Sequence, residues 1–290
     1  MPSMLIDKEA FLRKLDRIPD LPTLPVVAFK VNKMLMDDDV NVRKLSETIE
    51  KDQAMVSKLL RLVNSAFYGF QSKIDNISHA ITILGFSTVR NAVVSISVVD
   101  AFSGREAFEE FSLSDFWKHS VAVAVTGRQL AQRSRLAVPD EVFVAGILHD
   151  VGKLVLAQHY QELFRDVWIA VQDEGLSFHE AEKALLPVDH AHIGGVLAAK
   201  WHLPEKLVEA IAYHHAVGTA ENNGNAVMTV SAADFLVHRF WSEKKAGDRP
   251  EPDQPAAEAL AAEIESADQW FPGVAAEIEQ ACSFFVEAVN

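Results

Sequence analysis

The sequence predicts an all-α protein, arranged as a two-lobed multi-helix bundle. Apolar residues recur mostly at the spacing of helix faces, and no region shows a series of alternating strands. Asparagine, aspartate, glycine and proline separate these segments, as expected at the ends of helices. Hydrophobic residues make up 49% of the 290 residues and charged residues 23%, which is enough apolar surface for a sizeable buried core.

The first lobe is expected over residues 1–105. Its first helix follows Pro22 and Pro25, and its second begins after the candidate N-caps Asp39 and Asn41. Gly85 separates the last two helices of this lobe. The first expected helix covers 24–36 and the second begins near residue 41. The other three cover 55–63, 77–84 and 89–99.

The second lobe is expected over residues 106–245, with the boundary in the charged segment 103–114. Its helices are predicted over 116–133, 141–159, 162–173, 178–185, 190–201, 204–215 and 227–241. A charged, proline-rich stretch at 246–255 has the composition of a linker. It opens an acidic region, 246–290, in which we expect one or two short helices around Pro272 that pack weakly on the rest.

The charge balance argues against several functional classes. Lysine and arginine total 27 against 41 aspartates and glutamates, and the net charge of −14 repels nucleic acids and anionic membranes. A small phosphorylated ligand remains compatible, because a bound cation can invert the local field. The single cysteine, Cys282, excludes an intramolecular disulfide and favours the cytoplasm. We expect no signal peptide and no membrane span.

One set of histidines and aspartates carries most of the functional information. Its members are expected on different helices, on or beside the apolar faces. A buried carboxylate costs on the order of several kcal/mol unless it is paired or bound to a metal. Ion pairs or hydrogen bonds would satisfy any one member, whereas a metal would account for the whole set. The set is His119, His149, Asp150, His190, His214, His215 and Asp234.

These ligand types narrow the choice of metal. Imidazole and carboxylate groups suit Fe, Mn, Zn, Co or Ni, and the set offers no thiolate to select a softer ion. Seven ligands are too many for one tetrahedral zinc. They would serve one octahedral divalent ion, or two ions that share the Asp150 carboxylate.

Several motifs resemble a known family. Residues 146–153, Gly-Ile-Leu-His-Asp-Val-Gly-Lys, are similar to the signature of HD-domain phosphohydrolases, and residues 189–194, 201–204 and 214–215 resemble the HDOD branch. In the first lobe, residues 59–69 and 77–85 resemble the helices that precede the HD core in HDOD proteins. The resemblance covers about residues 20–242 and implies a bacterial signalling module with an HD-type helical core.

The resemblance also implies roles for individual residues. The HD-type metal ligands would be His119, His149, Asp150 and Asp234, and the ligands added in two-metal sites of the related HD-GYP proteins would be His190, His214 and His215. His192 competes with His190, which we prefer because it lies four residues before Gly194.

Asp150 and Lys153 are the candidate catalytic residues. Asp150 would bridge two metals, and Lys153 would direct its charge at a substrate phosphate, unless it is a solvated helix lysine. Asp115 would either add a carboxylate ligand or stabilise the start of its helix. Residues 216–224 replace the Gly-Tyr-Pro loop of HD-GYP proteins, so hydrolysis of cyclic dinucleotides is not expected.

Two functions are compatible with these patterns. The first is a non-catalytic regulatory module that binds signalling proteins or a small phosphorylated ligand. The second is a metal-dependent phosphohydrolase acting on a nucleotide or another phosphate ester; a di-iron redox or gas sensor is a third possibility. Surface or packing roles are assigned to His79, His159, His179, His202, His238 and Cys282, and a helix end to Asn64, Ser65, Phe67 and Tyr68.

Overall fold

The computed structural model describes residues 7–18, 21–34, 40–65, 73–103, 108, 110–241 and 253–286. All regular structure within these ranges is helical, so the predicted fold class is confirmed. Phe67 and Tyr68, part of the segment 103–114 and most of the segment 246–255 lie outside the described residues.

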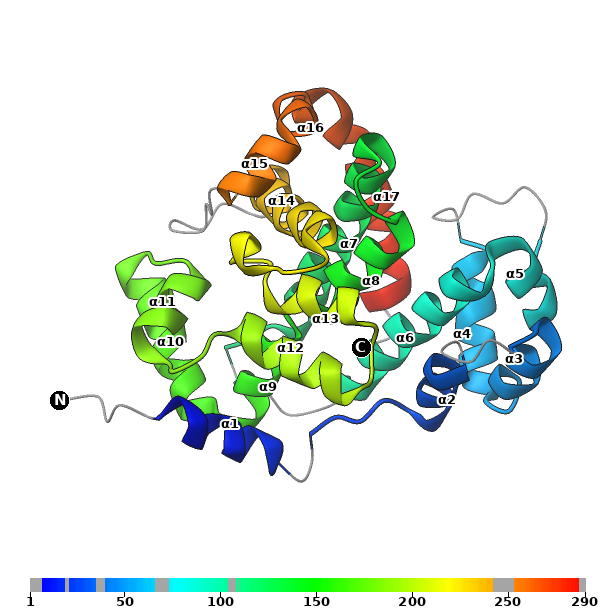
Figure 1. Ribbon diagram of the computed structural model, residues 1–290, viewed down its shortest axis with the longest axis horizontal. Helices are drawn as coiled ribbons and strands as arrows, with labels where there is room; N and C mark the ends of the chain where they lie inside the picture. The colour runs from blue at the N-terminus through cyan, green and yellow to red at the C-terminus, as the bar shows by residue number, and fades with distance from the viewer. Residues whose placement is uncertain are drawn as a thin grey trace.

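The five helices described between residues 26 and 102 form one group, on the right of Figure 1. Asn41, Asp52 and Asn76 cap three of them by accepting hydrogen bonds from backbone N–H groups three residues further on. Gly85, whose φ of 83° suits glycine, separates α5 from α6. The group comprises α2 (Val26–Met34), α3 (Val42–Ile49), α4 (Gln53–Val63), α5 (Ile77–Leu84) and α6 (Phe86–Phe102).

A short helix that the sequence analysis did not predict lies outside this group. Helix α1 (Lys8–Asp16) is capped by Asp7, and its Phe11 ring packs 4.8 Å from the ring of Tyr160, in the second half of the chain. The amino-terminal segment therefore packs on the far side of the molecule from α3, α4 and α5 (Figure 1).

The centre of the molecule is built from the helices after residue 112. These are α7 (Leu113–Ser134), α8 (Pro139–Leu148), α9 (Val151–His159), α10 (Gln161–Glu174), α11 (Phe178–Leu185), α12 (His190–Lys200), α13 (Glu205–Ala212), the 3-10 helix η1 (Val217–Thr219) and α14 (Gly224–Phe240). The helix expected over 141–159 is two helices, because the chain turns at His149 and Asp150. The helix expected over 204–215 ends at Ala212.

The described carboxyl-terminal helices pack against this centre. They are α15 (Gln254–Ala259), α16 (Ala261–Glu265) and α17 (Ala267–Val286), and α17 lies alongside α7 (Figure 1). Ile278 and Phe285 are buried, and the Glu277 carboxylate accepts hydrogen bonds from Gln129 Nε2 at 2.9 and 3.1 Å. Pro272 stands inside α17, which continues as one helix. The expected weak packing is not seen, because α17 has a continuous apolar face that the acidic composition of the region concealed.

The two groups of helices meet along several contacts. Helix α6 packs on α8, and the indole Nε1 of Trp201 donates a hydrogen bond of 2.8 Å to the carbonyl of Pro22. Asn32 Nδ2 donates to the carbonyl of His202 at 2.6 Å. Buried side chains from both groups therefore form a continuous core.

Within the described part of the chain, no single helix is long and apolar enough to cross a membrane. Of the described helices, α5 and α6 reach that length and composition as a pair, and they are bent by 119°.

Candidate metal centre

The seven predicted ligands come together in the middle of the second group of helices. Their positions on the elements differ from the expectation that all lie within helices. His119 lies on α7 and Asp234 on α14, whereas the other five stand at helix ends. His149 and Asp150 form the turn between α8 and α9, His190 is the first residue of α12, and His214 and His215 follow α13.

A glycine permits the closest helix approach at this site. A Cβ added to Gly152 on α9 would lie 2.0 Å from the carbonyl oxygen of His190 and 2.9 Å from the backbone nitrogen of Gly194. Any side chain there would push α12 away from α9. The glycine in the Asp150-Val-Gly sequence therefore lets Asp150 and His190, on two different helices, lie side by side.

Backbone carbonyls orient two of the imidazole rings. Nδ1 of His149 lies 2.8 Å from the carbonyl oxygen of Gly146, and Nδ1 of His214 lies 2.7 Å from that of Ile211. With Nδ1 donating to a carbonyl, the neutral ring presents an unprotonated Nε2, as a metal ligand must. Both rings thus direct their Nε2 atoms toward the interior of the cluster.

Asp150 lies at the centre of the cluster and is only 2% exposed. Its Oδ1 is 3.0 Å from Nε2 of His190, and its Oδ2 is 3.4 Å from Nε2 of His149 and 3.7 Å from Nε2 of His119. Nζ of Lys153 also contacts Oδ2, at 2.7 Å. The carboxylate therefore faces histidines on both sides, which is the arrangement of a bridging ligand.

Asp234 organises the other edge of the cluster. Its Oδ1 lies 3.1 Å from Nε2 of His119 and 3.4 Å from Nε2 of His238. The sequence analysis gave His238 a surface or packing role. The missed signal was its spacing, since residues four apart lie on the same face of a helix and Asp234 was already a candidate ligand.

The donor atoms fit a divalent transition metal. Among the described residues, Nε2 of His149 and Oδ1 of both Asp150 and Asp234 are buried and lack a hydrogen-bond partner, although imidazole nitrogens lie 3.0 and 3.1 Å from the two oxygens. Such atoms are rare in folded proteins unless an ion or water satisfies them. Three sets have ligand atoms within 4.8 Å of one another: Asp150, His190, His214 and His215; His119, His149 and Asp150; and His119, Asp234 and His238.

The electrostatics keep both carboxylates ionised. Burial opposes ionisation of Asp150, but His149, Lys153 and His190 outweigh it and hold the pKa of Asp150 well below its usual range. Asp234 also has a pKa well below the usual range, because His238 and His119 outweigh the effect of burial. The cluster therefore offers two anionic ligands at neutral pH.

The histidines fall into two classes. Burial lowers the pKa of His214 and of His215 well below the usual range, and it also lowers the pKa of His119, so these rings are neutral and ready to bind a metal. His190 differs: burial disfavours its charge, but the Glu182 carboxylate beside it raises its pKa to about 9.

Glu182 is a second residue that the sequence analysis missed. It is fully buried on α11, and its Oε2 lies 2.5 Å from Nδ1 of His190 and accepts the backbone N–H of the same residue at 3.1 Å. A carboxylate on the outer nitrogen of a ligating histidine fixes the ring and makes it a stronger donor. In the sequence, the one indication of this contact was that Glu182 lies on the expected helix that precedes His190.

The remaining candidates have different surroundings. Lys153 is largely buried, with its ammonium 4.9 Å from the centre of the Phe178 ring and paired with Asp150, so it is not a solvated lysine. The Asp115 side chain is 74% exposed and pairs with Lys118, which matches the alternative role at the start of its helix. His192 is half-buried and is absent from the three sets of clustered ligands, whereas His190 belongs to one.

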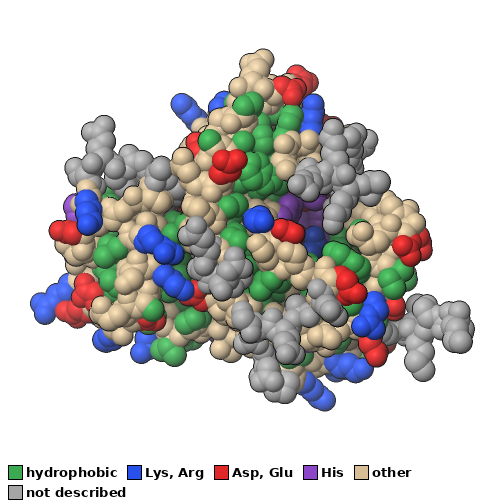
Figure 2. Space-filling model, turned by 180° about the vertical axis from the view of Figure 1, so that it is seen from behind, with side chains coloured by type: hydrophobic (Ala, Val, Ile, Leu, Met, Phe, Trp, Pro, Cys, Tyr) green, Lys and Arg blue, Asp and Glu red, His purple; other side chains and the backbone are tan. Residues whose placement is uncertain are grey.

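Part of the cluster is close to the surface. Figure 2 shows histidine side chains in a recess near the middle of the back face, beside acidic and basic side chains. The His119 and His238 side chains are 18% and 16% exposed, whereas His149 and His190 are fully buried. The site is therefore buried at His149 and His190 and partly exposed at His119 and His238.

A family model and curated relatives match this chain. The model, of the HDOD domain, covers residues 21–217. An uncharacterized protein of Treponema pallidum (strain Nichols) is 25% identical over 226 residues, which are 78% of this chain and 43% of that protein. The uncharacterized protein YuxH of Bacillus subtilis (strain 168) is 27% identical over 81 residues, 28% of this chain and 20% of that protein. The chain thus spans less than half the length of these relatives.

Solved structures share the fold over nearly the whole chain. An HDOD domain protein of Geobacter sulfurreducens has a TM-score of 0.78 at 24% identity, over 94% of this chain and 96% of that one. A candidate phosphohydrolase of Shewanella amazonensis SB2B has a TM-score of 0.71 at 26% identity, over 96% of this chain and 97% of that one. The first likeness concerns the fold alone.

Proposed function

The chain belongs to the HDOD domain family, and we propose that it is a regulatory signalling module whose helical core holds one or two divalent transition-metal ions. The observation that carries the proposal is the Asp150 carboxylate, which is shared by two of the three clustered ligand sets and whose buried Oδ1 lies 3.0 Å from Nε2 of His190. A divalent cation at this point would satisfy the buried oxygen and neutralise the two buried carboxylates.

Burial of the ligands favours a regulatory role over turnover. An enzyme of this kind needs an open coordination position and groups that contact the substrate. Lys153, the residue expected to bind a phosphate, is instead paired with Asp150 and packed over Phe178. The metal would then fix the arrangement of the helices that supply its ligands, and a signalling protein would recognise that arrangement.

Metal analysis tests this proposal. Protein purified without chelator or affinity metal is expected to contain about one or two first-row transition-metal ions per chain. Asp150→Ala should lose most of this metal, and the matched control Asp115→Ala, which removes an exposed carboxylate, should keep it. Wild-type protein with less than roughly a tenth of an ion per chain would overturn the proposal.

A metal-dependent phosphohydrolase is the second candidate. It is favoured by the partly exposed edge at His119 and His238 and by the structure that is 26% identical, a candidate phosphohydrolase. A bound metal would act there as a Lewis acid toward a phosphoryl group. In this role Lys153 would exchange its contact with Asp150 for one with a substrate phosphate, and His119 and His238 would line the approach.

An activity panel separates the two candidates. Metal-replete protein is assayed with phosphomonoesters, phosphodiesters and nucleotides, with Mn, Fe or Ni added. A phosphohydrolase would turn over at least one of them, lose activity in Asp150→Ala, and act poorly on cyclic di-GMP because residues 216–224 replace the Gly-Tyr-Pro loop. No turnover by protein that retains its metal would leave the regulatory role as the function.

A further inference from the structure

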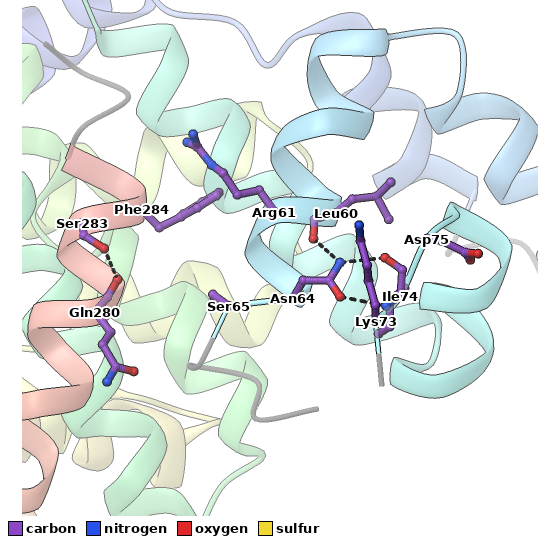
Figure 3. A pocket seen from close by; sticks show the side chains of 10 residues that line it. All are labelled: Leu60, Arg61, Asn64, Ser65, Lys73, Ile74, Asp75, Gln280, Ser283 and Phe284. Atoms are coloured by element: carbon purple, nitrogen blue, oxygen red, sulfur yellow. Dashed lines mark hydrogen bonds between the residues drawn. The ribbon is translucent and has the colours of Figure 1, made fainter. Parts of the chain in front are cut away.

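A cavity outside the metal centre lies where α4 meets α17. It has a volume of about 640 Å³, within the range of small-molecule sites, and α4, α17 and residues 73–75 line it (Figure 3). Its lining includes Arg61 and Lys73 on one side and Gln280, Ser283 and Phe284 on the other. The metal-binding role proposed above makes no use of this cavity.

The lining is cationic in a strongly acidic protein. Arg61 and Lys73 both face the cavity, and among the described residues neither forms an ion pair with a carboxylate. Asp75 is the acidic residue of the described lining, and it accepts a hydrogen bond of 2.8 Å from Asn76 Nδ2. In Figure 3 its carboxylate points away from Arg61. Two cations without an ion-pair partner among the described residues, in a chain of net charge −14, form a local site for an anion.

An aromatic ring fixes one of these cations. The Arg61 guanidinium lies 4.9 Å from the centre of the Phe284 ring, and Phe284 is only 8% exposed. A guanidinium stacked on an aromatic face loses less freedom when it binds an anion, and its outer face remains available to another planar group. This pair therefore presents both a positive charge and a flat stacking surface.

Two side-chain hydrogen bonds hold the segment that carries Lys73 in place. Asn64 Nδ2 donates to the carbonyl of Ile74 at 2.7 Å, and Asn64 Oδ1 accepts the backbone N–H of Ile74 at the same distance. This double hydrogen bond holds Lys73 and Asp75 against the end of α4 (Figure 3). The cavity is thus formed before a ligand arrives, which reduces the entropy cost of binding.

We propose that this cavity binds a nucleotide, with its phosphates on Arg61 and Lys73 and its base stacked on the Arg61 guanidinium that rests on Phe284. The two cations supply charge-assisted donors for phosphate oxygens, and the Gln280 amide and Ser283 hydroxyl provide polar partners for ribose or base. The nucleotide would contact α17, and α17 packs along α7, which carries His119 of the metal centre.

Titration calorimetry with the full, metal-containing chain tests the proposal. ADP and GDP are the probes, and pyrophosphate and adenosine separate the contributions of phosphate and base. Both nucleotides are expected to bind, more tightly than either fragment. Arg61→Gln should weaken binding about tenfold or more, as the loss of a charge-assisted contact does. Arg43→Gln removes an equal charge from the exposed surface of α3 and should leave binding unchanged.

Two further variants locate the ligand. Phe284→Leu keeps an apolar side chain but removes the ring, and it should weaken ADP more than pyrophosphate. His149→Ala disturbs the metal centre and should leave ADP binding intact. The proposal is overturned if neither nucleotide binds, if pyrophosphate binds as tightly as ADP, or if Arg43→Gln weakens binding as much as Arg61→Gln. It is equally overturned if binding survives Arg61→Gln but disappears in His149→Ala.

Discussion

The substitution Gly152→Ala should disturb the metal centre without altering any ligand. Gly152 follows Asp150 by two residues, at the point where α9 crosses the start of α12. The added Cβ would lie 2.0 Å from the carbonyl oxygen of His190, where an ordinary van der Waals contact is 3.4 Å or more. The two backbones must therefore separate by about 1.4 Å at this point.

The expected cost follows from this displacement. Overpacking of a close-packed interior costs about 1–3 kcal/mol, and a clash with backbone atoms of both His190 and Gly194 on α12 belongs at the upper end of that range. With an m-value near 3 kcal/mol/M, the urea midpoint should fall by about 1 M. The separation would also carry His190 away from Asp150 Oδ1, now 3.0 Å from its Nε2, so metal affinity should fall as well.

Two measurements and one control test this prediction. Urea unfolding of the chelated protein reports the packing cost, and the metal content of protein purified without chelator reports the effect on the site. Gly273→Ala is the control, because Gly273 lies in α17 and a Cβ there would meet no atom within 4 Å among the described residues, its chain neighbours and its own helix backbone aside. It should leave the metal content unchanged and stabilise the protein by up to about 1 kcal/mol.

A Gly152→Ala protein with the wild-type urea midpoint and full metal content would contradict this prediction. Loss of metal in the Gly273→Ala control would also refute it, since a general effect of replacing glycine would then explain the result.

Further predictions concern the ligands and their protonation. His149→Ala should remove most of the bound metal and His159→Ala should not; equal losses, measured by elemental analysis, would contradict the ligand assignment. Lys153→Ala should retain the metal, because a protonated lysine ammonium does not coordinate a metal ion. Loss of the metal from this variant would show instead that Lys153 is needed to assemble the site. Because the Glu182 carboxylate raises the pKa of His190 to about 9 against the effect of burial, His190 is protonated at pH 7 and must lose a proton to bind metal. Metal affinity should then increase by up to about tenfold from pH 7 to pH 8 and level off above the pKa, as measured by competition with a chelator; an affinity independent of pH would exclude this coupling.

The fold class and most of the candidate site could be predicted from the sequence. Helix periodicity and capping residues are local properties, so the all-α class and most helices after residue 112 were predicted close to their positions in the structure. The motif containing His149 and Asp150, with the histidines that follow it, indicated both the family and a set of residues that the structure brings together. Helix periodicity, capping residues and motifs can be detected in the sequence because each depends on neighbouring residues or on their order along the chain.

Tertiary structure decided the rest, since contacts between distant segments leave little trace in local patterns. The chain turns at His149 and Asp150 although the residues on both sides are apolar at helix spacing. In the sequence Glu182 resembles a surface residue, whereas in the structure α11 places its carboxylate against His190. Helix α17, in an acidic region, buries Ile278 and Phe285 because α7 offers a matching apolar face. The sequence determines which side chains are suited to burial or to metal binding. The way the helices cross determines which of these side chains come into contact, because residues far apart along the chain interact only after the core has packed.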